Sequence, residues 1–287
     1  MSDLLAADFT RLVKSQVFKG VIIFCIESLL FEVIAAHLNN NLNLIYLEAL
    51  LNTNFLVFGI LLSVFIGLFI GSEYSDGTIR NKLVAGNSRT AIYLSNLITC
   101  ILGGFIMQVI NFIELNIISI VIYKLPIPLT LKTVEKQVVA LYIIVAYTAI
   151  FLLVTTLICS KSGGTAAVMA LALLILTAGM TINGQLSSYD PKEAKAAEEA
   201  AAQSETQDPA YQYEVVGGFF VRQKKPLSGF KLKTFLFLDD FLPASQSQKL
   251  TSLRVPKNVS KYVLYDFSTA GLTTVLGIIL FKNKDLK

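Results

Sequence analysis

The feature that most constrains this chain is a set of six apolar runs, each about 20 residues long or longer. A helix rises about 1.5 Å per residue, so about 20 residues cross the roughly 30 Å of hydrocarbon in a bilayer. The composition agrees, with 54% hydrophobic residues, 15% charged residues and a mean hydropathy of +0.63. We therefore expect a single all-α polytopic membrane domain over residues 1–287. The six predicted spans are Val17–Leu38, Leu50–Ile70, Ile92–Ile122, Val138–Ser160, Gly164–Gln185 and Tyr262–Phe281.

The loops between these runs predict an orientation, because cytoplasmic loops of membrane proteins carry an excess of Lys and Arg. With the N-terminus inside, the inner segments hold ten of these residues and the short outer segments hold three. We therefore expect both termini and residues 71–90 to lie in the cytoplasm. The inner ten are Arg11, Lys14, Lys19, Arg80, Lys82, Arg89, Lys161, Lys282, Lys284 and Lys287, and the outer three are Lys124, Lys132 and Lys136.

The longest soluble segment, residues 182–261, is expected outside the cell as a large loop between the fifth and sixth spans. Its stretch DPKEAKAAEEAAAQ, beginning at Asp190, has the capping residues and alanines of a solvated helix. Further along, FLFLDDFLPASQS is apolar but too short to span, and Asp239, Asp240 and Pro243 interrupt it. We expect this second stretch to be interfacial or re-entrant.

Several kinds of functional site are not expected from this sequence. No stretch fits the phosphate-binding pattern G-x-x-x-x-G-K-[ST], and no HExxH metal motif is present. The single histidine, His37, has no cluster of metal-binding residues around it, and Cys25, Cys100 and Cys159 are expected to be free thiols. The basic residues are spread among loops without interleaved aromatics, so a nucleic-acid partner is not supported. We expect this chain to bind no cofactor or metal of its own.

Residues 71–90, GSEYSDGTIRNKLVAGNSRT, interrupt the apolar pattern between the second and third spans. Ile79 and Leu83 lie four residues apart and share one face, which predicts a short amphipathic helix parallel to the membrane. Ser75 or Asp76 is expected to cap the start of this helix, and Gly86 is expected to end it. Periodicity alone leaves two roles open, which are contact with lipid headgroups and docking onto another protein.

The same stretch carries a family resemblance. An acidic residue followed by Gly-Thr and a basic helix, EYSDGTIRNKL, and then AGNSRTAIYLSNLI leading into the next span, resemble the permease subunits of ABC-2 type bacterial exporters. The six-span layout, the large outer loop before the last span and its FLP turn extend the resemblance over most of the chain. It implies a multi-pass protein of the bacterial plasma membrane that couples ATP hydrolysis by a separate subunit to export.

By this resemblance, the stretch forms the coupling helix that sits in a cleft of the ATP-hydrolysing (nucleotide-binding) subunit, and ATP and Mg bind only to that partner. Glu73, Gly77, Thr78 and Arg80 match the family pattern directly. The full predicted coupling site is Glu73, Asp76, Gly77, Thr78, Ile79, Arg80 and Leu83.

The resemblance also implies pairing in the membrane. Similar permeases work as two copies or with a sister permease, so that the export pathway lies between two chains. The stretch GGTAAVMALAL, beginning at Gly163, offers small residues that would permit close contact between helices.

Four acidic residues in the spans are candidates for the substrate pathway, namely Glu27, Glu32, Glu114 and Asp266. A charge in the hydrocarbon costs about 2.5–3.5 kcal/mol and normally faces protein or water. These residues are expected in the middle or the outer half of the membrane, which suits a cationic amphipathic cargo such as an antimicrobial or cytolytic peptide. Purely structural roles, with hydrogen bonds to Ser, Thr, Asn or water, stay open for all four.

Two other classes of protein stay open. A secondary transporter also carries intramembrane carboxylates, but it usually has more helices, arranged as inverted repeats. A membrane sensor or immunity protein would work without an ATPase partner. An ATPase with a phosphate-binding loop encoded beside this chain would favour the exporter, and its absence would favour the other classes.

Overall fold

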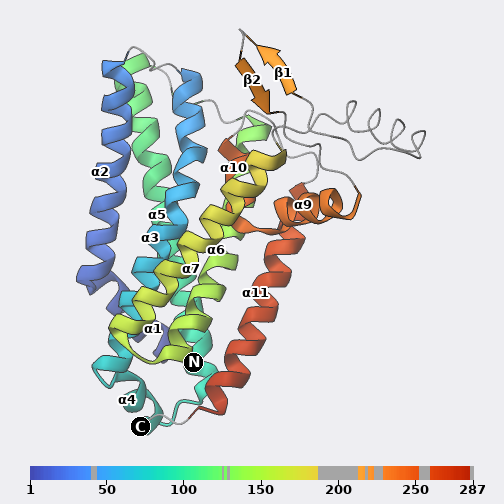
Figure 1. Cartoon of the computed structure of the whole chain (residues 1–287). Helices are drawn as coiled ribbons and strands as arrows, with labels where there is room; N and C mark the ends of the chain where they lie inside the picture. Colours follow the sequence, from blue (N-terminus) through green and yellow to red (C-terminus); the bar gives the residue numbers. More distant parts are fainter. Residues whose placement is uncertain are drawn as a thin grey trace, which may run out of the picture.

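The computed structural model describes residues 1–39, 44–124, 126–127, 130–186, 213–216, 219–222, 229–251 and 259–284. These residues form a bundle of long helices standing side by side, with shorter helices at both ends (Figure 1). The elements are α1 (Ser2–Lys14), α2 (Gln16–Leu38), α3 (Leu44–Ser75), α4 (Thr78–Val84), α5 (Arg89–Tyr123), α6 (Leu131–Ile158), α7 (Lys161–Leu186), β1 (Tyr213–Val216), β2 (Phe219–Arg222), α9 (Gly229–Phe241), α10 (Pro243–Thr251) and α11 (Val259–Lys282).

Six of these helices are long and apolar enough to cross a membrane, so the prediction of six apolar spans is confirmed. The segments are Gln16–Leu38 in α2, Val57–Ser75 in α3, Arg89–Ile122 in α5, Thr133–Ile158 in α6, Lys161–Leu186 in α7 and Val259–Lys282 in α11. They identify a multi-pass membrane protein by length and composition. The helix predicted to begin at Asp190 lies outside the described residues.

Three elements, α1, β1 and β2, have no counterpart in the prediction. α1 forms a helix with one buried face, because Leu4, Asp8 and Leu12 recur every four residues. β1 and β2 form an antiparallel hairpin in which Val216 pairs with Phe219, as suits β-branched and aromatic residues. The expected all-helical fold therefore holds for the described parts of the chain apart from this hairpin.

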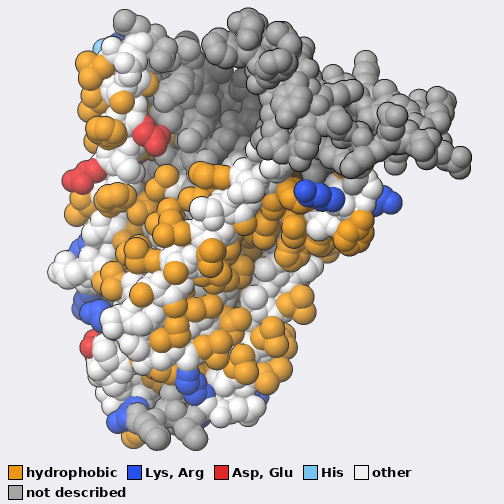
Figure 2. Space-filling view, viewed as in Figure 1, with side chains coloured by type: hydrophobic (Ala, Val, Ile, Leu, Met, Phe, Trp, Pro, Cys, Tyr) orange, Lys and Arg blue, Asp and Glu red, His pale blue; other side chains and the backbone are white. Residues whose placement is uncertain are grey.

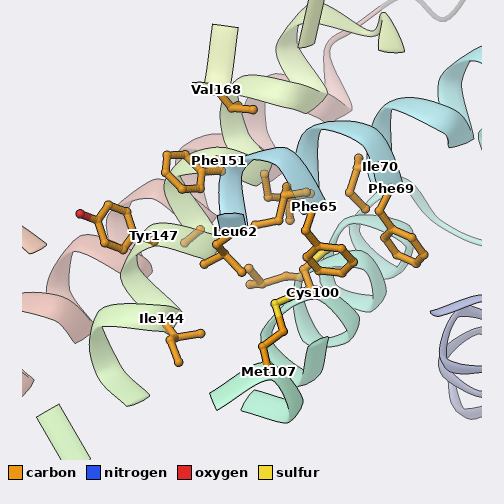
Figure 3. Packing of buried hydrophobic residues seen from close by; sticks show 14 of the residues in the cluster. Leu62, Phe65, Phe69, Ile70, Cys100, Met107, Ile144, Tyr147, Phe151 and Val168 are labelled. Carbon is orange, nitrogen blue, oxygen red and sulfur yellow. The ribbon is translucent and has the colours of Figure 1, made fainter. Parts of the chain in front are cut away.

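α3 and α6 form the centre of the bundle and are the most deeply buried of the six apolar helices. α7 packs mainly along α3, and α11 packs mainly along α6. Figure 3 shows Leu62 and Phe65 of α3 among buried side chains of neighbouring helices, including Met107 of α5 and Ile144 of α6. Full burial of such a side chain contributes about 1.5–3 kcal/mol, so this cluster holds the central helices together.

Glycines allow α3 and α7 to approach closely. A Cβ at Gly67 would lie 2.7 Å from the Cα of Thr165, and a Cβ at Gly71 would lie 2.8 Å from the Cα of Lys161. The small residues of α7 that the sequence offered as a face for a second permease are divided: Gly164 and Ala172 are packed inside the chain's own bundle, whereas Gly163, Ala166 and Ala170 are exposed. The buried residues of α7 are Gly164, Val168, Ala172, Gly179 and Ile182.

α1 displaces α2 along the bundle. Leu12, near the end of α1, lies beside α5, because a Cβ at Gly103 would come within 3.5 Å of the Leu12 Cδ1 atom. Gly103 follows Arg89, the first residue of α5, by a helical rise of about 21 Å. α2 follows α1 directly, so it starts about 20 Å further along the bundle than α5 and reaches well beyond α11 (Figure 1).

One side chain ties the start of α5 to the end of α11. The guanidinium of Arg89 donates to the carbonyl oxygens of Phe281 (3.0 Å) and Lys282 (2.9 Å). The last carbonyls of a helix have no partners within it, so this contact satisfies them and complements the helix dipole. α1, α4 and the end of α11 lie at one end of the bundle, and α9 and α10 lie toward the other (Figure 1). We call these the α4 end and the α10 end.

Gly277 of α11 gives a direct test of the packing against α5. A Cβ there would lie 2.1 Å from the hydroxyl oxygen of Tyr93, a buried residue of α5. The Gly277→Ala variant should therefore lose about 1–3 kcal/mol of stability through overpacking. Thermal unfolding in detergent measures this loss, with a fluorogenic maleimide that reacts once the buried thiols of Cys25 and Cys100 become exposed.

The matched control is Gly271→Ala on the same helix, where a new Cβ would have no atom within 4 Å. This variant should be neutral or gain up to about 1 kcal/mol from the higher helix propensity of alanine. Equal melting temperatures for the two variants would contradict the tight contact at Gly277.

Candidate functional site

α4 is a short helix that connects α3 and α5 between two glycine joints. Gly77 and Gly86 have φ angles of 70° and 86°, in the left-handed region that favours glycine. The predicted end at Gly86 is confirmed. The predicted N-cap is wrong, because Gly77 occupies the cap position and no side chain caps the helix. Ser75 instead donates a hydrogen bond to the Asp76 carboxylate at 3.0 Å.

Beside α4, four helices contribute polar side chains to one group, which we call the ionic cluster. Its members are Asp8 and Arg11 of α1, Glu73 of α3, Lys82 of α4, and Ser95 and Asn96 of α5. Four of them are fully or almost fully buried, and Lys82 is only 10% exposed. Charged side chains are rarely buried unless they are paired, so the pairing within the cluster is what allows their burial.

Glu73 is the centre of the ionic cluster. Its carboxylate accepts from the Arg11 guanidinium at 2.9 Å, from the Asn96 amide at 2.6 Å and from the Lys82 ammonium. Arg11 also lies over the ring of Phe69, 3.9 Å from its centroid. One fully buried carboxylate therefore joins α1, α3, α4 and α5.

Asp8 forms the second half of the ionic cluster. It pairs with the Lys82 ammonium at 2.7 Å and accepts from the Ser95 hydroxyl at 2.6 Å. Lys82 donates to the Asn96 carbonyl oxygen as well, at 3.2 Å. Lys82 is thus held by two carboxylates and an amide from three different helices, which fixes α4 against its neighbours.

The predicted coupling residues divide into three groups. Glu73 and Ile79 are buried within the chain's own bundle, and Leu83 is half-buried against the same core. Asp76 and Arg80 are exposed, while the remaining two are intermediate in exposure. The apolar stripe of α4 therefore faces its own bundle, and its exposed surface includes Arg80, Asn81 and Val84, the last 88% exposed. The two intermediate residues are Gly77 and Thr78.

Sequence reasoning missed most members of the ionic cluster. Asp8 could have been found, because it falls between Leu4 and Leu12 on the apolar face of a helical pattern. Ser95 and Asn96 interrupt an apolar run, which is a weaker signal of a buried polar contact.

The structure places three of the four acids predicted for a substrate pathway on the adjacent helices α2 and α5. Glu27 is exposed on α2, and Glu32 and Glu114 are partly buried on α2 and α5. Glu114 lies close to Cys25, two residues from Glu27. Both carboxylate oxygens of Glu114 and one of Glu32 are buried without a hydrogen-bond partner among the described residues.

Asp266, the fourth predicted acid, lies apart from the other three. It is fully buried in α11, and its carboxylate lies beside Gln246 of α10. Gln246 is itself buried and donates to the backbone oxygen of Asp240 at 2.9 Å. Asp266 therefore belongs to the packing of α10, and the other three acids belong to the α2 and α5 surface.

A second set of charged contacts joins α9, α10 and α11 at the α10 end. Lys249 pairs with Asp239 at 2.7 Å and with Asp240 at 2.6 Å. Asp240 also pairs with Lys261 at 2.5 Å and accepts from the Tyr262 hydroxyl at 3.2 Å. Pro243, which follows this acidic pair in the sequence, takes the first position of α10, where the missing amide hydrogen does no harm.

The two neighbouring carboxyl groups have opposite pKa shifts. Burial raises the pKa of Asp239, and the hydrogen bond and charge of Lys249 only partly offset this effect. Burial also raises the pKa of Asp240, but hydrogen bonds from Lys249 and Lys261 outweigh it, so that the pKa of Asp240 is lowered overall.

Replacing Glu73 tests the ionic cluster. Glu73→Gln keeps the size of the side chain but leaves Arg11 and Lys82 with one carboxylate fewer in a buried site. We expect a loss of about 3–5 kcal/mol, as for other broken buried ion pairs. Asp76→Asn, an exposed control three residues away, should stay within about 0.5 kcal/mol. Thermal unfolding compares them, and a fully stable Glu73→Gln protein would contradict the central role of this carboxylate.

The opposite pKa shifts of Asp239 and Asp240 predict opposite effects of their removal. Asp240, with a lowered folded pKa, contributes stability above its unfolded pKa of about 3.9, and this is lost as pH falls through the folded pKa. Asp239, with a raised folded pKa, contributes stability only at low pH, and this is lost as pH rises through the folded pKa.

Near neutral pH, Asp240→Asn should therefore lower the melting temperature, and Asp239→Asn should leave it unchanged or raise it. The deficit of Asp240→Asn should shrink on acidification below about pH 4. Melting curves over a pH series measure both trends. Parallel pH profiles for the two variants would show that the two carboxylates are equivalent and would contradict the assignment.

Comparison with known proteins gives no family for this chain. No family model matches its sequence, and no curated protein matches it. Among the described residues, no group of three or more His, Cys, Asp and Glu side chains could hold a metal ion. The function has to be argued from α4, the ionic cluster and the α10 end.

Proposed function

We propose that this chain is the membrane-spanning permease subunit of an ATP-driven exporter of the ABC-2 type in a bacterial plasma membrane. The main observation behind the proposal is how α4 is held. Buried charged side chains fix this short helix to α1, α3 and α5, while its outer face stays exposed. A helix held in this way transmits a push on its exposed face to the long helices behind it. The family resemblance of residues 71–99 supports the same role.

In this proposal the α4 end lies in the cytoplasm, where a separate ATPase subunit binds ATP and Mg and docks onto α4. The exposed residues Arg80, Asn81 and Val84 form the docking surface, with Val84 as its apolar contact and Arg80 as its charge. Glu73, Lys82 and Ile79 act behind this surface as positioning residues. This chain hydrolyses no ATP itself.

The exit side of the proposed pathway is the opposite, acidic part of the bundle. Glu27 and Glu32 lie on α2 and Glu114 lies on the adjacent helix α5, close to Cys25 and away from α4. An electronegative surface at the exit suits a cationic amphipathic cargo, so we propose a peptide of this kind as the substrate. A second permease, as an identical copy or a sister chain, would close the pathway from the other side.

Copurification of the ATPase encoded beside this chain tests the proposal. The double variant Arg80→Glu/Val84→Asp should weaken capture of the ATPase by about tenfold, because it removes an apolar contact and reverses a charge. Lys14→Glu is the control, since it reverses an exposed positive charge outside α4, at the last residue of α1, and should leave capture unchanged. Permease-stimulated ATPase activity in vesicles provides the second measurement.

Two results would overturn the proposal. The first is that the unaltered chain captures and stimulates no ATPase. The second is that the double variant captures the ATPase as well as the Lys14→Glu control does, which would leave α4 as a helix that only contacts lipid headgroups.

A further inference from the structure

α9 carries an exposed face of aromatic residues with lysines on both sides. Phe230 is 85% exposed and Phe237 is 50% exposed. These two rings and Phe241 fall within about 40° of one another around the helix, at about 100° per residue. Lys231 and Lys233 are both exposed and flank this aromatic stripe on opposite sides. The face is therefore apolar along its middle and positively charged along its edges.

The position of α9 is about one bilayer thickness away from the α4 end. The rings of Phe237 and Phe241 pack edge-on against Tyr265 of α11, with centroids 5.9 Å and 5.8 Å apart. Tyr265 precedes Lys282, where the apolar span of α11 ends, by a helical rise of about 26 Å. The hydrocarbon of a bilayer is about 30 Å thick, so a bilayer that covers the apolar span of α11 has its second surface at about the level of α9.

The protein surface between the α4 end and the level of α9 is apolar. Exposed hydrophobic side chains cover the outer side of α11, as expected for contact with lipid tails. α9 runs across the upper part of this belt, and Figure 2 shows basic side chains beside hydrophobic ones there. The exposed hydrophobic residues of α11 are Leu264, Phe267, Leu272, Val275, Leu276, Ile279 and Leu280.

We infer that α9 lies in the membrane–water interface and that Lys231 and Lys233 bind the phosphate groups of anionic lipid headgroups. Aromatic rings favour this boundary, and lysine stems run along apolar surface while the ammonium reaches the headgroups. The two lysines point to opposite sides of the helix, about 160° apart across the aromatic stripe, so they do not converge on one small soluble anion. A layer of headgroups meets both of them.

The absence of tryptophan from the sequence gives a clean optical test with the full-length chain. Phe230→Trp places the only indole on the aromatic stripe, and Phe267→Trp places it on the lipid-facing side of α11, 65% exposed, as a control. Each protein is reconstituted into vesicles of phosphatidylcholine and phosphatidylglycerol, in which only one of the two lipids carries brominated chains that quench indole fluorescence.

In the Phe230→Trp protein, brominated phosphatidylglycerol should quench the indole fluorescence several times more strongly than the same fraction of brominated phosphatidylcholine does. Adding Lys231→Gln and Lys233→Gln should make the two lipids equal, and high salt should weaken the preference, because the attraction is electrostatic. At Phe267→Trp, both lipids should quench equally, with or without the lysines. Both lysines are exposed on α9, so their replacement should leave the melting temperature unchanged.

Three outcomes would overturn the inference. Emission that neither brominated lipid quenches would place α9 in water. Equal quenching by both lipids would show that α9 lies at the membrane interface but that its lysines do not select anionic headgroups. Loss of the preference on addition of inorganic phosphate, at constant ionic strength, would identify a soluble anion as the ligand. None of these outcomes depends on α4 or on an ATPase, so the inference stands or falls separately from the proposed export function.

Discussion

The structure depends on one carboxylate that water does not reach. Glu73 is fully buried and accepts hydrogen bonds from side chains of α1, α4 and α5. Because a buried charge is costly without partners, these helices are held in the one arrangement that supplies all of them. That arrangement places α1 against the start of α5 and so decides how far along the bundle α2 begins. The height of Glu27 and Glu32 in the bundle therefore follows from a contact nearer its α4 end.

The two ends of the bundle use charge in different ways. In the ionic cluster the charged groups are largely enclosed, and Asp8 and Glu73 each accept from at least two donors. At the α10 end Asp240 and its lysine partners remain partly exposed, so salt and pH act on them more strongly. The stability of the α9 and α10 segment therefore responds more to solution conditions than the stability of the ionic cluster does. The aromatic and basic face of α9 at the lipid boundary makes this segment depend on membrane composition as well.

The apolar helices could be predicted from the sequence, because an apolar run of this length can satisfy its backbone hydrogen bonds within a bilayer only as a helix. The ionic cluster could not, since Asp8 and Ser95 are 87 residues apart and no local pattern pairs them. The amphipathic character of α4 was visible in Ile79 and Leu83, but the sequence did not say that this stripe faces the chain's own core. The prediction that the four acids lie in the middle or the outer half of the membrane also assumed that all spans begin at the same level, which α1 prevents.

The contact between Arg89 and the end of α11 has a practical consequence for handling the protein. Arg89 holds the carbonyls of Phe281 and Lys282, and the Lys284 ammonium reaches the Leu157 carbonyl at the end of α6. The last described residues are thus bonded to the helix that follows α4. An affinity tag fused without a spacer after these residues would pull on the start of α5. A flexible linker, or a tag placed elsewhere, would leave the start of α5 and the neighbouring α4 undisturbed.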